Sequence, residues 1–482
     1  MQLSVLAEAA AAYCLKTTGD CDIQTLSQDS RRKINCGLFF CIDGAHFDAH
    51  TFAEQAVQNG AVALVVTRLL PHIDVPQVLV SNDRAAMALM ASAFYGNPAR
   101  KLRMIGVTGT KGKTTTTYLI KSILDSAGIP SGLIGTTGNM IGDQWLKGNL
   151  TTPDPIELHA TLKQMVDARV EAVCMEVSAH AIDMHRLEGV VFEAGCFTNL
   201  SQDHLDYFGT MENYFETKKR YFTSGMVKNA ALNVDDDLTG DLRKDVHIPV
   251  STFGISANAD IFARDIEIGE EGLKFVLSLW NEQRYPVEMK MMGMFNVYNA
   301  LAATAVSLIL GIEPAFIVKG LESIQSVPGR AELLETHTPY KVILDYSHSP
   351  AAMTNILETV RGFVRGRIIL LFGCGGDRDH GKRPIMGEAA GLGADYTIIT
   401  SDNPRTEDPM RIMLDIEQGM KKTKGSYEML ENRREAIVKA LDIARDGDVV
   451  ILAGKGDETY QDINGVKRPF DEKQIVKEIL GK

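Results

Sequence analysis

A glycine-rich segment between a predicted strand and a predicted helix constrains the fold of this chain most strongly. Residues 106–115 read GVTGTKGKTT. Upstream, residues 104–108 predict a short buried strand, and downstream Ile120 and Ile123 fall at helical spacing before Gly128 ends the pattern. A loop in this position presents backbone N–H groups to a phosphate. The sequence therefore predicts an α/β unit that binds a nucleoside triphosphate.

This loop also carries the side chains that phosphate binding needs. Lys113 is expected to reach the terminal phosphates, and the hydroxyl of Thr114 to ligate the magnesium ion that accompanies them. The loop is a variant, because Val107 stands where the general pattern has its first glycine. The alternative is a glycine-rich turn that binds nothing, and the flanking strand and helix argue against it. The residues predicted to contact ATP here are Gly109, Thr110, Lys111, Gly112, Lys113, Thr114 and Thr115.

Length and turn-rich joints predict three domains. The chain has 482 residues, 45% of them hydrophobic, which is enough for separate cores. Turn-forming residues cluster at 95–98 and 326–330. The predicted domains are therefore residues 1–98, 99–328 and 329–482. In the last two, apolar strand-like runs alternate with helical patterns, which is typical of a doubly wound α/β fold.

Composition excludes several classes of protein. The formal charge of −12 argues against broad nucleic-acid binding. No apolar run approaches the ~18 residues that a membrane span needs, and the first residues lack the regions of a signal peptide. We therefore expect a soluble, cytoplasmic protein without a membrane span. The seven cysteines lack metal-ligand spacing, and Cys174, Cys196 and Cys374 are expected in the core as reduced thiols.

Polar residues follow two further strand-like runs in the central part of the chain. In α/β sheets, ligands bind beyond the carboxyl ends of the strands. Glu176 lies near the exit of one apolar run, where burial is costly unless the carboxylate is paired or binds a metal ion. The next run leads to His204, which stands between Asp203 and Asp206. A capping or core histidine is the alternative for His204, but these neighbours favour a magnesium site.

A set of ordered motifs resembles those of the Mur ligases, and within them the members that add the third residue of the peptidoglycan stem peptide. The resemblance runs from near residue 29 to beyond residue 460 and implies the three-domain architecture of that family, with a central P-loop domain and a C-terminal Rossmann-like domain. The motifs are GVTGTKGKTT, MEVSAHAIDMHR, TNLSQDHLDYFGTMENYFETKK, GMFNVYNALAA, VPGRAE, LDYSHSP, GCGGDRDHGKRP, SDNPRTEDP and AGKGDE.

The resemblance implies an ATP-dependent ligase. Its substrates are UDP-N-acetylmuramoyl-L-alanyl-D-glutamate and an amino acid, and the γ-phosphoryl group of ATP first activates the D-glutamyl carboxylate as an acyl phosphate. The implied catalytic residues are Lys113, Glu176, His204 and Lys218, and the implied magnesium ligands are Thr114, Glu176, His204 and Lys218. Lys218 corresponds to the family's carbamylated lysine (N6-carboxylysine). A solvated basic helix face is the alternative that the residues alone favour for Lys218.

Further ATP contacts carry over by position. They are Asn296 and Asn299 on the adenine side, and Arg330 and Asp345, with Tyr346 and His348, on the phosphate and nucleoside side. Without the resemblance, the asparagines would be N-caps of an apolar helix. Because Arg330 and Asp345 lie beyond the joint at Pro328-Gly329, closure of the last domain is expected to complete the site and exclude water.

The resemblance also divides the other substrates between the domains. The uridine nucleotide and its peptide fall to hydroxyl groups, arginines and loop residues of the first and central domains, which suit phosphate and carboxylate recognition. The family's usual Asp-Gly-His is here Asp48-Ala49-His50. The predicted residues are Ser30, Arg31, Gly44, His50, Thr151, Thr152, Ser178 and Arg186.

An Asn-Pro-Arg motif in the last domain resembles the family's signature for meso-diaminopimelate. That substrate carries a distal carboxylate, onto which Arg405 and Arg378 are expected to fork, whereas lysine lacks this group. Asp457 replaces the histidine most common in such enzymes, so L-lysine or another diamino acid stays open. The predicted residues are Arg378, Asp402, Asn403, Pro404, Arg405, Gly454 and Glu458.

Three other protein classes compete with this interpretation. The run from Gly373 to Asp377 suggests a dinucleotide-binding oxidoreductase, but the third glycine is out of register. A non-catalytic nucleotide-binding regulator derived from a ligase would show damage among the implied catalytic residues, and none is seen. Folylpolyglutamate synthase shares the chemistry, but the uridine-type first domain and the Asn-Pro-Arg motif point away from it.

Overall fold

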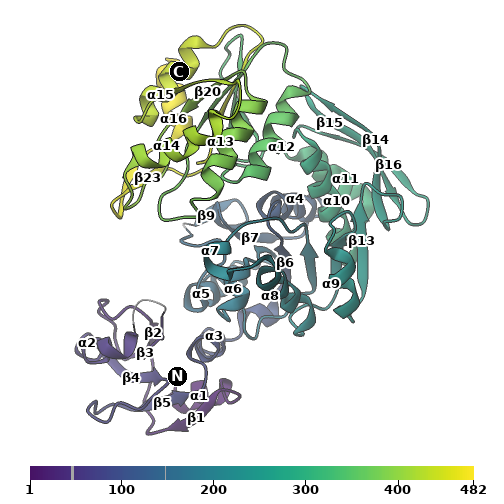
Figure 1. The fold of residues 1–482 in the computed structure, drawn as a ribbon. Helices are drawn as coiled ribbons and strands as arrows, with labels where there is room; N and C mark the ends of the chain where they lie inside the picture. The colour runs from purple at the N-terminus through teal and green to yellow at the C-terminus, as the bar shows by residue number, and fades with distance from the viewer. Residues whose placement is uncertain (45–47, 147, 482) are drawn as a thin grey trace.

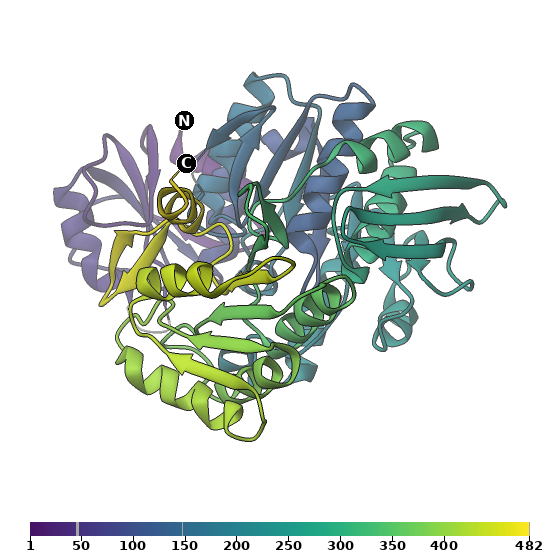
Figure 2. The ribbon, with the colours of Figure 1, turned by 90° about the horizontal axis from the view of Figure 1, so that it is seen from above.

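The computed structural model describes residues 1–44, 48–146 and 148–481. Its three larger sheets have five, eleven and six strands. Figure 1 shows three lobes in chain order, with the N-terminal lobe at the bottom, the phosphate-loop lobe in the middle and the C-terminal lobe at the top, and Figure 2 turns this view by 90°. Among the described residues, no helix combines the length and apolar content needed to cross a membrane.

The first lobe is built on the five-stranded sheet, in the order β1-β5-β4-β3-β2. Strands β2 to β5 are parallel, and β1 pairs antiparallel with β5. The strands are β1 (Cys14–Thr17), β2 (Thr25–Ser27), β3 (Gly37–Phe40), β4 (Ala61–Val66) and β5 (Gln77–Val80), and the helices are α1 (Leu3–Ala9), η1 (Ala49–Phe52), α2 (Ala53–Gln58) and α3 (Asp83–Phe94).

The central lobe has a parallel core with antiparallel hairpins at both edges. The strand order is β16-β15-β14-β13-β12-β11-β6-β10-β7-β8-β9. The strands are β6 (Arg103–Thr108), β7 (Ser131–Gly135), β8 (Gly138–Ile141), β9 (Gln144–Leu146), β10 (Ala172–Glu176), β11 (Ala194–Phe197), β12 (Ala230–Asn233), β13 (Val250–Gly254), β14 (Ile261–Gly269), β15 (Gly272–Leu279) and β16 (Arg284–Met289). The helices are η2 (Pro98–Lys101), α4 (Lys113–Ser126), α5 (Pro155–Asp167), α6 (Ala179–Asp183), α7 (Leu205–Phe208), α8 (Met211–Thr223), α9 (Thr239–Asp245), α10 (Met294–Ile309) and α11 (Pro314–Ser323).

The C-terminal lobe is again α/β, with the strand order β17-β18-β22-β19-β20-β21. The five strands β18, β22, β19, β20 and β21 are parallel. A short pair, β23 with β24, forms a separate sheet. The strands are β17 (Glu332–Leu334), β18 (Lys341–Asp345), β19 (Ile368–Phe372), β20 (Tyr396–Ile399), β21 (Ser426–Met429), β22 (Val449–Ala453), β23 (Tyr460–Ile463) and β24 (Val466–Pro469). The helices are α12 (Pro350–Arg361), α13 (Lys382–Gly393), α14 (Pro409–Met420), α15 (Arg433–Ile443) and α16 (Glu472–Ile479).

The structure confirms the doubly wound α/β fold of the last two lobes. Each lobe has its own core, because separate clusters of buried apolar residues flank each of the three large sheets. Cys174, Cys196 and Cys374 are buried in these cores, as expected, and burial raises the pKa of the Cys374 thiol to about 12. The domain boundaries after residues 98 and 328 stay predictions.

Two glycines let helix α8 approach the central sheet closely. A Cβ atom on Gly106 in β6 would lie 2.0 Å from the hydroxyl oxygen of Tyr221 in α8, and one on Gly195 in β11 would lie 3.0 Å from its ring. Tyr221 is fully buried, and its hydroxyl has no hydrogen-bond partner among the described residues. Lys218 precedes Tyr221 by three residues and therefore lies on the same face of α8. The glycines thus decide how near Lys218 comes to the phosphate loop.

We predict that Gly106→Ala destabilises the protein by about 1–3 kcal/mol, because the new methyl group overpacks against Tyr221. Thermal unfolding measures this loss, and ATP turnover should fall with it because α8 is displaced. The double variant Gly106→Ala/Tyr221→Phe should recover part of both, since it removes the clashing oxygen. Gly240→Ala is the matched control, because a Cβ atom there meets nothing within 4 Å. Equal stability of Gly106→Ala and Gly240→Ala would contradict this account of the packing.

Candidate active site

Three neighbouring strands of the central sheet bring the predicted catalytic residues together. Strand β6 lies between β10 and β11 and is parallel to both. The phosphate loop follows β6, Glu176 ends β10, and residues 198–204 follow β11. Because parallel strands end at the same edge of a sheet, the three segments meet where the strand order reverses. The segments that the sequence predicts to carry site residues therefore lie at one edge of the sheet.

Residues after β11 hold the phosphate loop in shape. The backbone N–H of Thr110 donates to the carbonyl oxygen of Asn199 at 2.8 Å, and that of Lys111 donates to the Asn199 side chain at 3.0 Å. The hydroxyl of Thr198 donates to the carbonyl oxygen of Lys111 at 2.6 Å. Gly109 has a φ of 147°, and a Cβ atom there would lie 1.9 Å from the Thr198 hydroxyl. The loop can adopt this shape only with glycine at 109.

Lys113 and Thr114 lie at the start of α4, beneath the loop. The Lys113 ammonium donates to the carbonyl oxygens of Gly109 and Thr110, each at 3.0 Å. Burial lowers the pKa of Lys113 to about 8. The Thr114 hydroxyl accepts a hydrogen bond of 3.1 Å from the guanidinium of Arg330, which belongs to the following lobe. Side chains from both lobes therefore meet at the loop.

Glu176 is almost fully buried, with an exposed fraction of 1%. Its carboxylate accepts hydrogen bonds from the backbone N–H and the hydroxyl of Thr136, at 2.8 and 3.1 Å. The Thr136 hydroxyl also contacts that of Thr151 at 3.0 Å. Gly135 leaves room for the carboxylate, since a Cβ atom there would lie 2.4 Å from a Glu176 oxygen. The sequence reading missed Thr136, although the polar run after β7 was a usable signal.

Lys218 is buried under the same loop and is not part of a solvated basic face. Its exposed fraction is 1%, and its ammonium donates to the Gly109 carbonyl oxygen at 3.0 Å. It lies 4.8 Å from the centre of the Tyr214 ring. Burial, together with the charge of Lys113, keeps the pKa of Lys218 well below its usual value. An uncharged amine is the form of lysine that can react with carbon dioxide.

His204 is the N-cap residue that precedes α7. It adopts a left-handed backbone conformation, with a φ of 55°. Its ring packs edge to face against that of His180, 4.9 Å between centres. Burial lowers the pKa of His204 to about 4, so its imidazole is neutral and able to act as a ligand. The neighbouring Asp203 forms an ion pair with Lys111 at 3.2 Å.

The donor set fits a magnesium ion that takes most of its ligands from a nucleotide and water. Among the described residues, no group of three His, Cys, Asp or Glu side chains is placed to hold a metal ion. Thr114 and Glu176 each supply oxygen atoms near the loop. Magnesium bound to phosphates commonly takes one or two such ligands from the protein. An unmodified Lys218 offers no acceptor, so Lys218 itself could be a metal ligand only in a carbamylated form.

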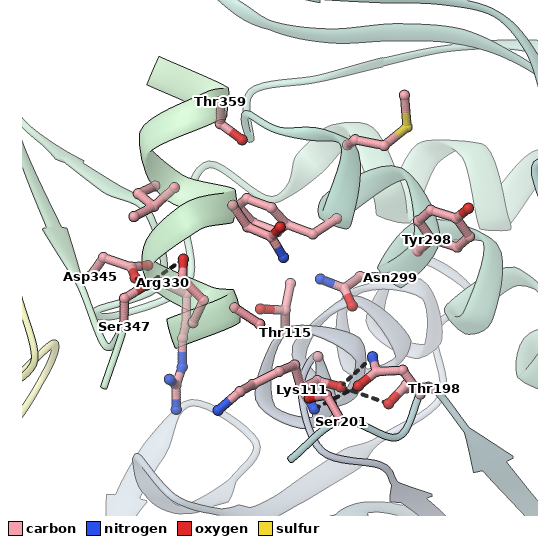
Figure 3. Close-up of a pocket in the computed structure, with 18 of the residues that line it drawn as sticks. Lys111, Thr115, Thr198, Ser201, Tyr298, Asn299, Arg330, Asp345, Ser347 and Thr359 are labelled. Carbon is pink, nitrogen blue, oxygen red and sulfur yellow. Dashed lines mark hydrogen bonds between the residues drawn. The ribbon is translucent and has the colours of Figure 1, made fainter. Parts of the chain in front are cut away.

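A cavity of about 630 Å³ opens beside the loop between the central and C-terminal lobes. Figure 3 shows Lys111, Thr115 and Asn299 on one side and Arg330 and Asp345 on the other. Asn296 does not line the cavity. It is buried behind Asn299, whose side-chain amide donates to it at 2.9 Å. Asn299 is therefore the one placed to contact a ligand, and Asn296 orients it.

Arg330, Asp345 and Tyr346 form the C-terminal side of this cavity. The guanidinium of Arg330 stacks on the Tyr346 ring, 4.3 Å from its centre. Asp345 accepts the backbone N–H of Ala331 at 2.7 Å and a short hydrogen bond from the hydroxyl of Ser347. Burial raises the pKa of Asp345. Asp345 thus fixes the turn that carries Arg330 rather than pairing with it directly.

A second cavity, of about 420 Å³, adjoins the first. Tyr346, His348 and Ala351 line both cavities. From the central lobe, the cavity is also lined by His180, Gln202, Asp203, His204 and Asp206. The remaining lining residues belong to loops after strands and to helices α12 and α13 of the C-terminal lobe. Of the residues predicted to bind the amino acid, it contains Arg378, Asp402, Asn403, Arg405, Gly454 and Glu458, whereas Pro404 is buried and does not line it.

Arg405 is held in a defined position at this cavity. Its backbone has a φ of 51°, and its guanidinium donates to the carbonyl oxygen of Gly376 at 2.5 Å. A Cβ atom on Gly375 would lie 3.0 Å from the guanidinium. Gly375 therefore leaves room for the Arg405 guanidinium, and Gly376 supplies its carbonyl acceptor. This role differs from that of a dinucleotide-binding loop.

The residues predicted for the uridine substrate lie elsewhere, and none of the eight, as the structure describes them, lines either cavity. Several of their side chains already form hydrogen bonds within the protein. The ring of His50 is buried between Asp48, at 2.6 Å, and the backbone N–H of Thr67, at 3.0 Å. Thr152 is buried, and its hydroxyl donates to the Glu176 carbonyl oxygen at 2.7 Å. Thr152 therefore supports the Glu176 end of β10.

The others of this set are more accessible. Arg31 is 83% exposed on its side chain and forms an ion pair with Asp29. Ser30 donates to the side chain of Gln55 at 3.0 Å. Arg186 pairs with Asp154 at 2.9 Å and donates to the Thr152 carbonyl oxygen. Ser178 caps α6, and Gly44 and Thr151 are partly buried. These residues span the first and central lobes.

Family models and full-length relatives of this chain point to the same family. Family models match residues 107–307 (Mur ligase middle domain) and 329–456 (Mur ligase, glutamate ligase domain). The chain is 43% identical to the UDP-N-acetylmuramoyl-L-alanyl-D-glutamate--2,6-diaminopimelate ligase of Geobacillus thermodenitrificans, with 99% of each chain covered. It is 44% identical to the ligase of the same name from Caldanaerobacter subterraneus subsp. tengcongensis, covering 97% of this chain and 96% of that one. A solved structure with this name superimposes with a TM-score of 0.68, at 32% identity and 95% coverage of both chains. The chain belongs to the Mur ligase family.

Proposed function

We propose that this chain is the ATP-dependent ligase that adds meso-diaminopimelate to UDP-N-acetylmuramoyl-L-alanyl-D-glutamate in peptidoglycan precursor synthesis. The observation that carries the proposal is the adjacency of the two cavities. Lys111, Gly112 and Thr115 of the phosphate loop line the first cavity, Asn403 and Arg405 of the Asn-Pro-Arg segment line the second, and three residues line both. A phosphoryl group and an amine bound there would approach the same carboxylate.

The arrangement suits an acyl-phosphate mechanism. Lys113 would neutralise the triphosphate, and Asn299 and Arg330 would hold the nucleoside and phosphate ends. Thr114 and Glu176 would hold a magnesium ion, and His204 with carbamylated Lys218 would hold a second. Magnesium would neutralise charge on the transferring phosphoryl group and on the substrate carboxylate. Closure of the C-terminal lobe would exclude water from the activated carboxylate.

The second cavity favours diaminopimelate over lysine as the amino acid. Arg405 and Arg378 lie at its wall and would bind a distal carboxylate, and Glu458 would accept an ammonium group. Lysine would leave the arginines unpaired. The relatives that carry the diaminopimelate name at over 40% identity agree with this choice. The uridine contacts and the cytoplasmic location stay predictions.

Phosphate release tests the proposed function directly. The intact chain is incubated with ATP, magnesium and the uridine dipeptide, and with diaminopimelate, L-lysine or no amino acid. We expect rapid phosphate release and a new tripeptide only with diaminopimelate. Turnover with L-lysine but not with diaminopimelate would show that the chain is the lysine-adding ligase instead. ATP binding without turnover of either amino acid would favour the non-catalytic regulator.

We predict that Arg405→Ala lowers kcat/KM for diaminopimelate by ~100-fold, or about 3 kcal/mol, because a buried carboxylate loses its partner. The KM values for ATP and for the uridine dipeptide should stay within about twofold, since Arg405 lines only the second cavity. Arg411→Ala, an exposed arginine on α14, is the control. Unchanged turnover of diaminopimelate by Arg405→Ala would remove the specificity assignment.

We predict that Lys218→Met abolishes ligation, with a loss of at least ~100-fold in kcat, because the carbamate that would hold metal cannot form. Mass spectrometry of the intact wild-type chain in bicarbonate buffer should show an added carbon dioxide that Lys218→Met lacks. Lys219→Met, which removes an adjacent lysine paired with Glu216 and Asp245, should keep both the modification and most of the activity. Full activity of Lys218→Met would contradict the assignment.

A further inference from the structure

A lysine that the mechanism has not used lies buried beneath the amino-acid cavity. Lys455 follows β22 and has an exposed fraction of 0%. Its ammonium donates to the side-chain oxygen of Asn403 at 3.1 Å and to Oε2 of Glu458 at 3.2 Å. Both partners line the second cavity, whereas Lys455 does not. A fully buried lysine is costly unless its charge is paired, so this placement demands these contacts.

The contacts of Lys455 fix the orientation of Glu458. Oε2 of Glu458 accepts two hydrogen bonds, from Lys455 and from the side-chain amide of Asn403 at 2.8 Å. Its other oxygen, Oε1, receives a hydrogen bond of 3.4 Å from the hydroxyl of Tyr346. One carboxylate oxygen is therefore tied to the protein, and Oε1 keeps accepting capacity for a ligand in the cavity.

Lys455 also joins the two loops that form this wall of the cavity. Asn403 belongs to the segment after β20, and Glu458 to the segment after β22. The Asn403 side-chain oxygen accepts the backbone N–H of Asp462 at 2.9 Å in addition to the Lys455 ammonium. Asn403 and Glu458 both accept hydrogen bonds from the Lys455 ammonium. Movement of either loop would therefore disturb the other.

We propose that Lys455 is a positioning residue for the amino-acid substrate: it holds the Glu458 carboxylate so that Oε1 meets the substrate's ammonium group. This inference rests on the proposed function for the presence of an amino acid in the second cavity. Lys455 touches no substrate and acts through Glu458. Its loss removes one of the two donors to Oε2 of the partly buried Glu458 side chain, so that only the Asn403 amide still holds this oxygen.

A double-mutant cycle tests this role through the KM for diaminopimelate. The variants are Lys455→Met, Glu458→Gln and their combination. We expect Lys455→Met to raise this KM about tenfold, with kcat and the KM values for ATP and the uridine dipeptide within about twofold. Because Lys455 acts through Glu458, the combination should raise the KM no more than Glu458→Gln alone. Lys421→Met, which replaces an exposed lysine at the C-cap of α14, controls for loss of a charge.

Several outcomes would overturn the inference. They are an unchanged KM in Lys455→Met, effects of the two single variants that multiply in the combination, or an equal loss for all three substrates. Thermal unfolding of each variant shows whether the C-terminal lobe is folded. The combination leaves no unpaired charge, so it keeps the test available if Lys455→Met unfolds. Failure of the proposed function is a separate result, because it appears as a wild-type chain that does not use diaminopimelate.

Discussion

The position of strand β6 between β10 and β11 is the constraint on which the rest of the site depends. This order places the phosphate loop, Glu176 and the segment after β11 at one edge of the sheet. Helix α8 then packs onto the same strands through glycines, and this packing brings Lys218 under the loop. A chemistry that needs several charged groups around one phosphate is thus built from neighbouring strand ends and one helix.

The C-terminal lobe completes the site with a small number of contacts. Arg330 reaches the Thr114 hydroxyl, and at the far side of the interface Glu270 pairs with Lys341 and Arg365. These ion pairs are partly exposed, and such pairs contribute little stability each. The interface also has an apolar part, because Met292 and Phe295 of the central lobe pack against the apolar cluster of the C-terminal lobe. Opening for substrate entry and product release would expose these two side chains. The same lobe supplies the wall shared by the two cavities, so opening would separate the two reactants.

The sequence predicted the parts of the site that obey a positional rule. Glu176 and His204 lie at or beyond the ends of apolar runs, and the rule that ligands bind at strand ends predicts both as site residues. It could not show which polar side chains face a ligand and which support others. Asn296, Thr152 and His50 turned out to be buried with their polar atoms engaged. Burial depends on packing between segments distant in the chain, which periodicity does not report.

Lysine shows this limit most clearly, because the same residue type has opposite meanings in different surroundings. Lys218 stands in a run of basic residues that by itself indicates a solvated helix face, and yet it is buried because Gly106 and Gly195 admit α8 so closely. Lys455 lies between two glycines after a buried strand and is buried for another reason, since it pairs with Glu458 between two loops. In both cases the cost of burying an amine is accepted where a functional group must be held: the phosphate loop over Lys218 and the Glu458 carboxylate over Lys455. For both lysines, burial against a polar group of the site is a stronger indication of their role than the charge pattern around them in the sequence.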